Sequence, residues 1–194
     1  MIRPSVPLPF GPQIMARLPA RRTWLKALHA VMIPLTFWFM IATPAFVNRV
    51  FGPGGAAINS KIALVFVTLC LIWTADYLRR GLASRPGPKL PPKARRFHQI
   101  LHKTIIWGLF CVPVGGLLLG FTASRQLWGG GIVPLGVPLS MPEANHIIGK
   151  IHIIQFYTLG AIIVVHASFH IWRHVKLRDN ALRIMAPKVL HRFL

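Results

Sequence analysis

Three histidines fall inside long apolar stretches, where a side chain that can ionise or bind a metal is costly and is therefore a candidate functional residue. They are His29, His152 and His166. Because His152 and His166 are 14 residues apart, a helix places them within roughly 40° of one face and about 21 Å apart along its axis. The sequence therefore predicts one helix face with an imidazole near each surface of a membrane.

His29 and His166 are predicted to lie at the same depth. His29 follows Trp24 by five residues at the start of one apolar stretch, and His166 precedes Trp172 by six residues at the end of another. Two neutral imidazoles on facing helices, with no Cys, Asp or Glu beside them, favour axial ligation of haem iron over a zinc or di-iron site.

Other histidines recur at a spacing of four residues, which also occurs in zinc sites. No Glu follows the first histidine of these runs and no third type of ligand is close in the sequence. We interpret them as basic residues near the headgroups of the cytoplasmic surface. They are His98 and His102, and the run His166, His170 and His174.

The composition indicates a membrane protein. The chain has 194 residues, of which 54% are hydrophobic, and its 23 Lys and Arg face only 3 acids. A nucleic-acid-binding protein would explain the charge but would not need long uncharged runs. An all-α integral membrane four-helix bundle explains both, with spans of about 20 residues. The predicted spans are Trp24 to Val47, Ile58 to Leu78, Thr104 to Phe121 and Ile147 to Trp172.

The basic residues predict the orientation of the bundle. Nineteen of the 23 lie in the N-terminal tail, the second connection or the C-terminal tail, so both termini are expected in the cytoplasm. The predicted organisation is a proline-rich basic arm over 1–22, the transmembrane domain over 23–178 and a basic tail over 179–194. The apolar segment from Trp128 to Pro142 is expected to rest on the outer end of the bundle.

Two smaller patterns predict contacts. Gly116 and Gly120 form a G-x-x-x-G pattern on the third span, which favours close contact with another helix. Asp76 precedes Arg79 and Arg80 by three and four residues, so ion pairs along the surface of its own helix are expected.

Several motifs together resemble the prokaryotic cytochrome b561 family. They are Lys26-Ala-Leu-His29, the pair His152 and His166, Phe110-Cys-Val-Pro-Val-Gly-Gly-Leu117 and Arg178-Asp-Asn-Ala-Leu-Arg-Ile-Met-Ala-Pro187. The resemblance covers about Arg21 to Pro187. It implies a four-helix membrane cytochrome that carries b-type haem and passes electrons, often to or from quinone. Some members of that family oxidise superoxide at the outer face.

The resemblance also implies which residues bind haem. It assigns a cytoplasmic-side haem to His29 and His166, and an outer haem to His152 together with a histidine at the start of the second span. That second histidine is missing, because no histidine occurs between His29 and His98. The outer position could use Lys61 or His146, hold five-coordinate iron on His152, or bind no haem.

The expected function is therefore electron transfer in a bacterial inner membrane, with membrane lipid and quinone as partners and no nucleic acid. Whether the chain is also an enzyme stays open, and superoxide oxidation is expected only if an outer haem is present. The alternative is an accessory or assembly subunit of a larger respiratory or photosynthetic complex, docked through the N-terminal arm. A basic membrane anchor without a cofactor is the third hypothesis.

Overall fold

A computed structural model of the chain describes residues 21–84, 86–185 and 192. Most of the N-terminal arm expected over 1–22, and half of the tail expected over 179–194, lie outside the described residues. The remaining chain is almost entirely helical and contains one short hairpin.

Four helices are long and apolar enough to cross a membrane, and the chain is a multi-pass membrane protein. They are α2 (Arg21–Ile41), α4 (Gly55–Arg80), α5 (Pro92–Thr122) and α6 (Pro142–Lys176). The short helix α3 (Pro44–Phe51) and the single 3-10 turn Gly52–Gly54 connect α2 to α4. The all-α four-helix bundle expected from the sequence is confirmed.

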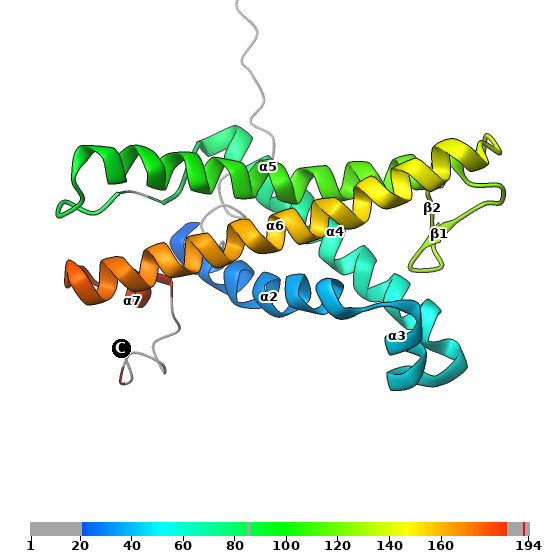
Figure 1. Cartoon of the computed structure of the whole chain (residues 1–194), viewed down its shortest axis with the longest axis horizontal. Coiled ribbons are helices and arrows are strands. Elements are labelled where there is room, and N and C mark those ends of the chain that lie inside the picture. Colours follow the sequence, from blue (N-terminus) through cyan, green and yellow to red (C-terminus); the bar gives the residue numbers. More distant parts are fainter. Residues whose placement is uncertain (1–20, 85, 186–191, 193–194) are drawn as a thin grey trace, which may run out of the picture.

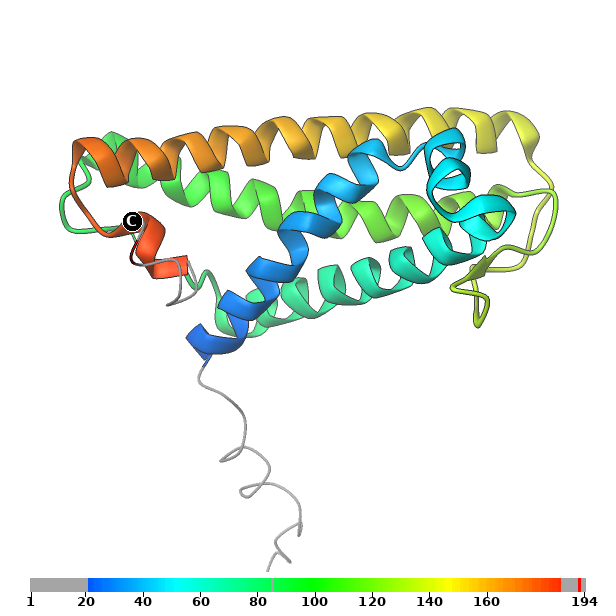
Figure 2. The same cartoon turned by 90° about the horizontal axis from the view of Figure 1, so that it is seen from below.

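The four long helices run up and down the bundle (Figures 1 and 2). Helices α5 and α6 lie antiparallel and make the most extensive helix contact, while α2 crosses obliquely and touches both α4 and α6 (Figure 2). As a result, the start of α2, the end of α4, the start of α5 and the end of α6 all lie at one end of the molecule. We call this the histidine-rich end.

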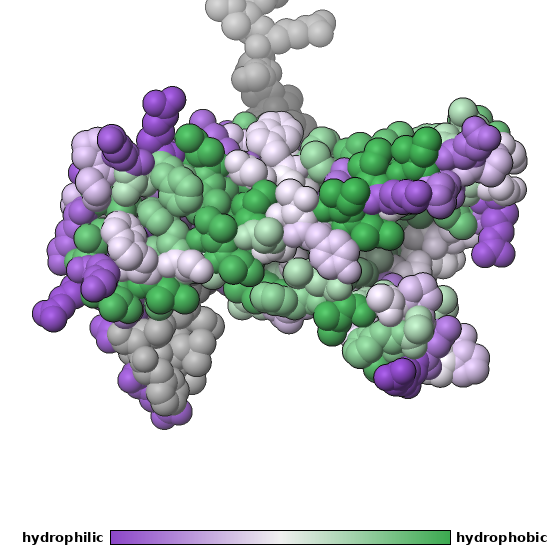
Figure 3. All heavy atoms as spheres, in the orientation of Figure 1, coloured by the Kyte–Doolittle hydropathy of each residue, from purple (hydrophilic) through white to green (hydrophobic). Residues whose placement is uncertain are grey.

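The core of the bundle is small and apolar. Its buried members come from all four long helices, and the largest fully buried apolar side chain among them is Phe66. Many large apolar side chains instead face outward, as in a protein surrounded by lipid. Figure 3 shows hydrophobic residues over the middle of one face and hydrophilic residues toward the two ends.

Two helix boundaries differ from the predicted spans by more than five residues. The first span ends at Ile41 and not at Val47, because Thr43 caps a new helix that begins at Pro44; its side chain accepts a hydrogen bond from the Phe46 amide (3.2 Å). Helix α5 begins at Pro92, twelve residues before the predicted start of the third span. The basic residues of this segment are too polar for a hydrophobic span, but they do not stop a helix.

The segment after α5 packs on the bundle as predicted. Strands β1 (Trp128–Gly129) and β2 (Val133–Pro134) pair in antiparallel fashion. The Ser60 hydroxyl of α4 donates to the Trp128 carbonyl (3.1 Å) and accepts from the Gly130 amide (2.9 Å). This hairpin therefore attaches to α4 at the end of the molecule opposite the histidine-rich end.

The glycine pattern acts differently from the prediction. A methyl group at Gly120 would overlap the backbone carbonyl of Leu135 in the loop after α5, whereas one at Gly116 would meet nothing within 4 Å. The close approach of α5 to α6 occurs at Gly108, which contacts Leu159, and at Gly115, which contacts His152. G-x-x-x-G therefore does not mark the helix interface here.

Asp76 joins two helices. Arg21 of α2 donates to one Asp76 carboxylate oxygen through Nε (2.9 Å) and Nη2 (2.7 Å), while Arg80 on the same helix is 3.8 Å away. The predicted pair with Arg80 is therefore present, but the closer partner, Arg21, was not predicted, since only the fold brings residues 21 and 76 together. The pair fixes the start of α2, two turns before His29, against the end of α4.

Candidate functional site: a histidine cluster

Five histidines from three helices meet at the histidine-rich end, and we call them the histidine cluster. Helices α5 and α6 each supply two residues four positions apart, which places each pair on one helix face. Because α5 and α6 are antiparallel, the first turns of α5 face the last turns of α6, and the two pairs come together. The cluster comprises His29 of α2, His98 and His102 of α5, and His166 and His170 of α6.

His29 and His166 face each other from α2 and α6, with ring centres 6.2 Å apart. A metal bound on opposite sides by two imidazoles, each at about 2.0–2.1 Å, separates the ring centres by about 6 Å. His29 Nδ1 is also buried and has no hydrogen-bond partner among the described residues. The separation of the two rings is therefore one at which His29 and His166 could hold a haem iron between them.

Trp73 of α4 holds the His29 ring in place. The two rings meet edge to face with centres 5.1 Å apart, which is a favourable geometry for aromatic groups. Leu25, Leu28 and Met32, on the surrounding turns of α2, are buried in the core. His29 is thus fixed by apolar contacts.

The tautomer of His102 follows from its contacts. His102 Nδ1 lies 2.7 Å from the His98 carbonyl oxygen, and because a carbonyl only accepts, Nδ1 carries the proton. His102 Nε2 then has a free lone pair, and it lies 3.2 Å from His166 Nε2. His166 therefore donates to His102, and this one hydrogen bond would have to open for His166 to hold a metal through Nε2.

His98 and His170 each place an unpartnered nitrogen in the cluster. His98 is fully buried, and its Nε2 shares a hydrogen bond with the Ser84 hydroxyl (3.0 Å). His98 Nδ1 and His170 Nε2 are buried without a hydrogen-bond partner among the described residues. Since buried polar atoms normally have partners, such nitrogens are candidates for binding a metal ion.

A buried ion pair lies beside the cluster at the histidine-rich end. Arg173 is only 2% exposed, and its Nε and Nη2 donate to one Asp179 carboxylate oxygen at 2.9 and 2.7 Å. A methyl group at Gly87 would lie 2.8 Å from Arg173 Nη2 and 2.9 Å from Asp179 Oδ2. The connection before α5 therefore covers this pair, and the charge of Arg173 is offset locally.

His152, the third predicted ligand, lies nearer the opposite end of α6 and apart from the histidine cluster. Its Nδ1 is 3.1 Å from Gln155 Oε1, and its ring packs on Phe156 and against Gly115. Within the described part of the chain, no second histidine ring contacts it. The residues around His152 therefore do not form a two-ligand haem site.

The two replacement ligands considered for this outer position are both poorly placed. Lys61 is exposed on α4. His146 is exposed on α6 itself, six residues before His152, and a helix turns residues at this spacing to different faces.

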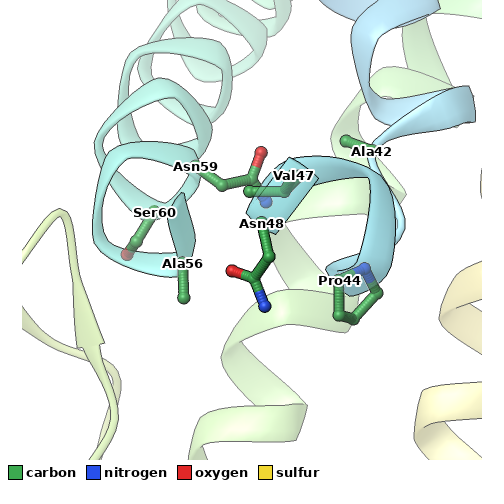
Figure 4. Close-up of a pocket in the computed structure, with 7 residues that line it drawn as sticks. All are labelled: Ala42, Pro44, Val47, Asn48, Ala56, Asn59 and Ser60. Atoms are coloured by element: carbon green, nitrogen blue, oxygen red, sulfur yellow. The ribbon is translucent and has the colours of Figure 1, made fainter. Parts of the chain in front are cut away.

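A shallow pocket lies where α2, α3 and α4 meet, away from the histidine cluster (Figure 4). Its polar lining consists of Asn48, Asn59 and Ser60. Asn59 already accepts a hydrogen bond from the Trp38 indole (2.8 Å), and Ser60 binds the hairpin. None of its lining residues is titratable, so the histidine cluster remains the candidate site.

Sequence reasoning placed His29 and His166 together but missed the other three of the five members of the cluster. His98, His102 and His170 were interpreted as headgroup-facing basic residues, and the structure corrects this, because their rings point into the bundle and toward one another. The sequence signal for these three histidines was the repeated spacing of four residues. Interpreting that spacing as a cluster required knowledge of the register of α5 against α6.

Comparison with known proteins adds no identification: no protein-family model and no curated protein matches the chain.

Proposed function

We propose that this chain is a membrane electron-transfer protein that holds one b-type haem between His29 and His166. The observation that carries the proposal is the pair of facing imidazoles with ring centres 6.2 Å apart. The resemblance of the last span to the cytochrome b561 pattern supports the same assignment.

In this proposal the protein's role is to position the two imidazoles and to bury them away from water. Trp73 fixes the plane of His29, the Arg21–Asp76 pair anchors the start of α2, and the apolar core excludes water from both imidazoles. When bound, the haem supplies a one-electron couple whose potential depends on ligand identity and burial.

The partner and location also belong to the proposal. Exchange of electrons with quinone rests on the family resemblance. The bacterial inner membrane, with the histidine-rich end facing the cytoplasm, rests on the Lys and Arg that gather at that end. A single haem would serve one side of the membrane. We therefore do not include superoxide oxidation at the outer face, where His152 lacks a second ligand.

The experiment is haem quantitation and reduced-minus-oxidised spectroscopy on the full chain purified in detergent. We expect one haem per chain, lost in His29→Ala and in His166→Ala. His152→Ala is the matched control, because it removes an imidazole from the same helix α6 and should retain the haem. Absence of haem from the wild-type protein, or its loss in His152→Ala alone, would overturn the proposal.

A further inference from the structure

We propose a second metal site, distinct from the haem pair, in which His98, His102 and His170 bind one late first-row transition metal ion. The ligand atoms of these three side chains all lie within 4.8 Å of one another. The site goes beyond the electron-transfer proposal and stands whether or not the haem assignment holds.

The three nitrogens are available for a metal. His102 Nε2 has a lone pair because its Nδ1 proton is held by the His98 carbonyl, and a metal would take this lone pair in place of the hydrogen bond from His166. His98 Nδ1 and His170 Nε2 are buried without partners in the described structure. A bound metal would give both nitrogens a partner. A purely structural role for these residues would leave both nitrogens without one.

The surroundings supply the contacts that orient metal ligands. Metal-binding histidines usually bond through their second ring nitrogen to a carbonyl, carboxylate or other polar group. His102 uses the His98 carbonyl for this, and His98 uses the Ser84 hydroxyl at 3.0 Å. Two of the three ligands are therefore already fixed in orientation.

The chemistry of the ligands selects the kind of metal. Three neutral imidazoles with no carboxylate exclude Mg²⁺ and Ca²⁺ as preferred ions, and the absence of a thiolate argues against an iron–sulfur cluster. Imidazole ligands suit Zn²⁺, Cu²⁺ and Ni²⁺. Arg173 is the nearby buried cation, and its pairing with Asp179 reduces its repulsion of a metal.

The spacing requires only a small adjustment. Nitrogens at about 2.0–2.1 Å from a tetrahedral metal lie about 3.3 Å apart, so side-chain rotation must close the wider separations. His102 Nε2 and His166 Nε2 are already 3.2 Å apart. His166 belongs to the pair proposed to hold haem. The three other histidines would therefore leave the fourth position of a tetrahedral metal open to another ligand.

The test uses Zn²⁺ as the probe, because zinc is measured independently of haem iron. The full chain in detergent is treated with a chelator, equilibrated with Zn²⁺, and assayed for zinc and haem per chain. We expect one zinc per chain in the wild type and a loss of affinity in His98→Ala and His170→Ala. The loss should be at least ~10-fold, because changes in second-shell partners alone cost about 10–100-fold.

Matched variants separate the site from general effects. His146→Ala removes an exposed imidazole from α6 and should retain zinc, while Ser84→Ala removes only a partner of His98 and should weaken binding by about 10-fold. Retention of haem in His98→Ala and His170→Ala shows that these variants fold. If the chain proves to lack haem, elution volume and helical circular dichroism serve instead.

Two results would overturn this site. One is less than one zinc per chain in the wild type at saturating Zn²⁺. The other is unchanged zinc binding when His98, His102 and His170 are all replaced by Ala. Absence of haem with one zinc per chain would refute the electron-transfer proposal and leave the metal site standing, whereas haem without zinc would do the reverse.

Discussion

His166 donates a hydrogen bond to His102 at an Nε2–Nε2 distance of 3.2 Å, and this contact joins the pair proposed to hold haem, His29 and His166, to the proposed metal site. Its direction is set one turn away, where His102 Nδ1 donates to the His98 carbonyl. His102 thus presents a lone pair to whichever group lies beside it. If His166 bound iron through Nε2, as proposed, that lone pair would become free.

This relationship predicts that His102→Leu separates the two sites. The variant keeps His29 and His166 as the facing pair, so haem per chain should stay at the wild-type level. Zinc binding should fall by at least ~10-fold, because a metal ligand is removed. Both are read in one preparation by reduced-minus-oxidised spectra and zinc quantitation. Loss of haem in this variant would mean that His102, and not His29, is the partner of His166.

A second prediction concerns the two glycines of the G-x-x-x-G pattern. Gly120→Ala should destabilise the protein by about 1–3 kcal/mol, because the new methyl group overlaps the Leu135 carbonyl and overpacks the contact. Gly116→Ala, four residues earlier on α5, meets open space and should be neutral or stabilising by up to about 1 kcal/mol. Thermal unfolding in detergent measures both. Equal effects of the two substitutions would contradict the packing described for α5.

A third prediction tests the ion pair that covers the histidine cluster. Asp179→Asn leaves the Arg173 charge buried without its partner and should cost about 3 kcal/mol. Asparagine keeps the side-chain oxygen that accepts from the Ala181 amide (3.1 Å), so the change isolates the charge. Lys176→Gln is the control. Lys176 is exposed and lies on the same last turn of α6 as Arg173, so its substitution should change stability by less than about 0.5 kcal/mol. Thermal unfolding that does not distinguish the variants would argue against a buried pair.

The fold was largely predictable from the sequence, because lipid imposes a strong constraint. Four apolar stretches of membrane length can only form helices that satisfy their own backbone, and the structure has these four helices. The boundaries were less predictable. The start of α5 at Pro92 lies in a basic segment, where hydropathy gives no signal for a helix.

Only the part of the site that depends on depth in the membrane could be predicted from the sequence. His29 and His166 could be paired because both lie about one and a half turns from the same end of their spans. The contribution of His98 and His102 depended on the early start of α5 and on its register against α6, neither of which is encoded locally. The Arg21–Asp76 and Arg173–Asp179 pairs depended in the same way on which helices and loops become neighbours.

The lengths of α5 and α6 have a consequence for how a metal reaches the cluster. Helices of 31 and 35 residues extend about 46 and 52 Å, well beyond a hydrocarbon layer of about 30 Å. Counted back from Thr122, about 20 residues of membrane-spanning helix end near His102. With the hydrocarbon layer ending at Thr122, His98 and Ser84, which bonds to it, would lie at the opposite water boundary, so an ion would be loaded from a single compartment without entering the lipid.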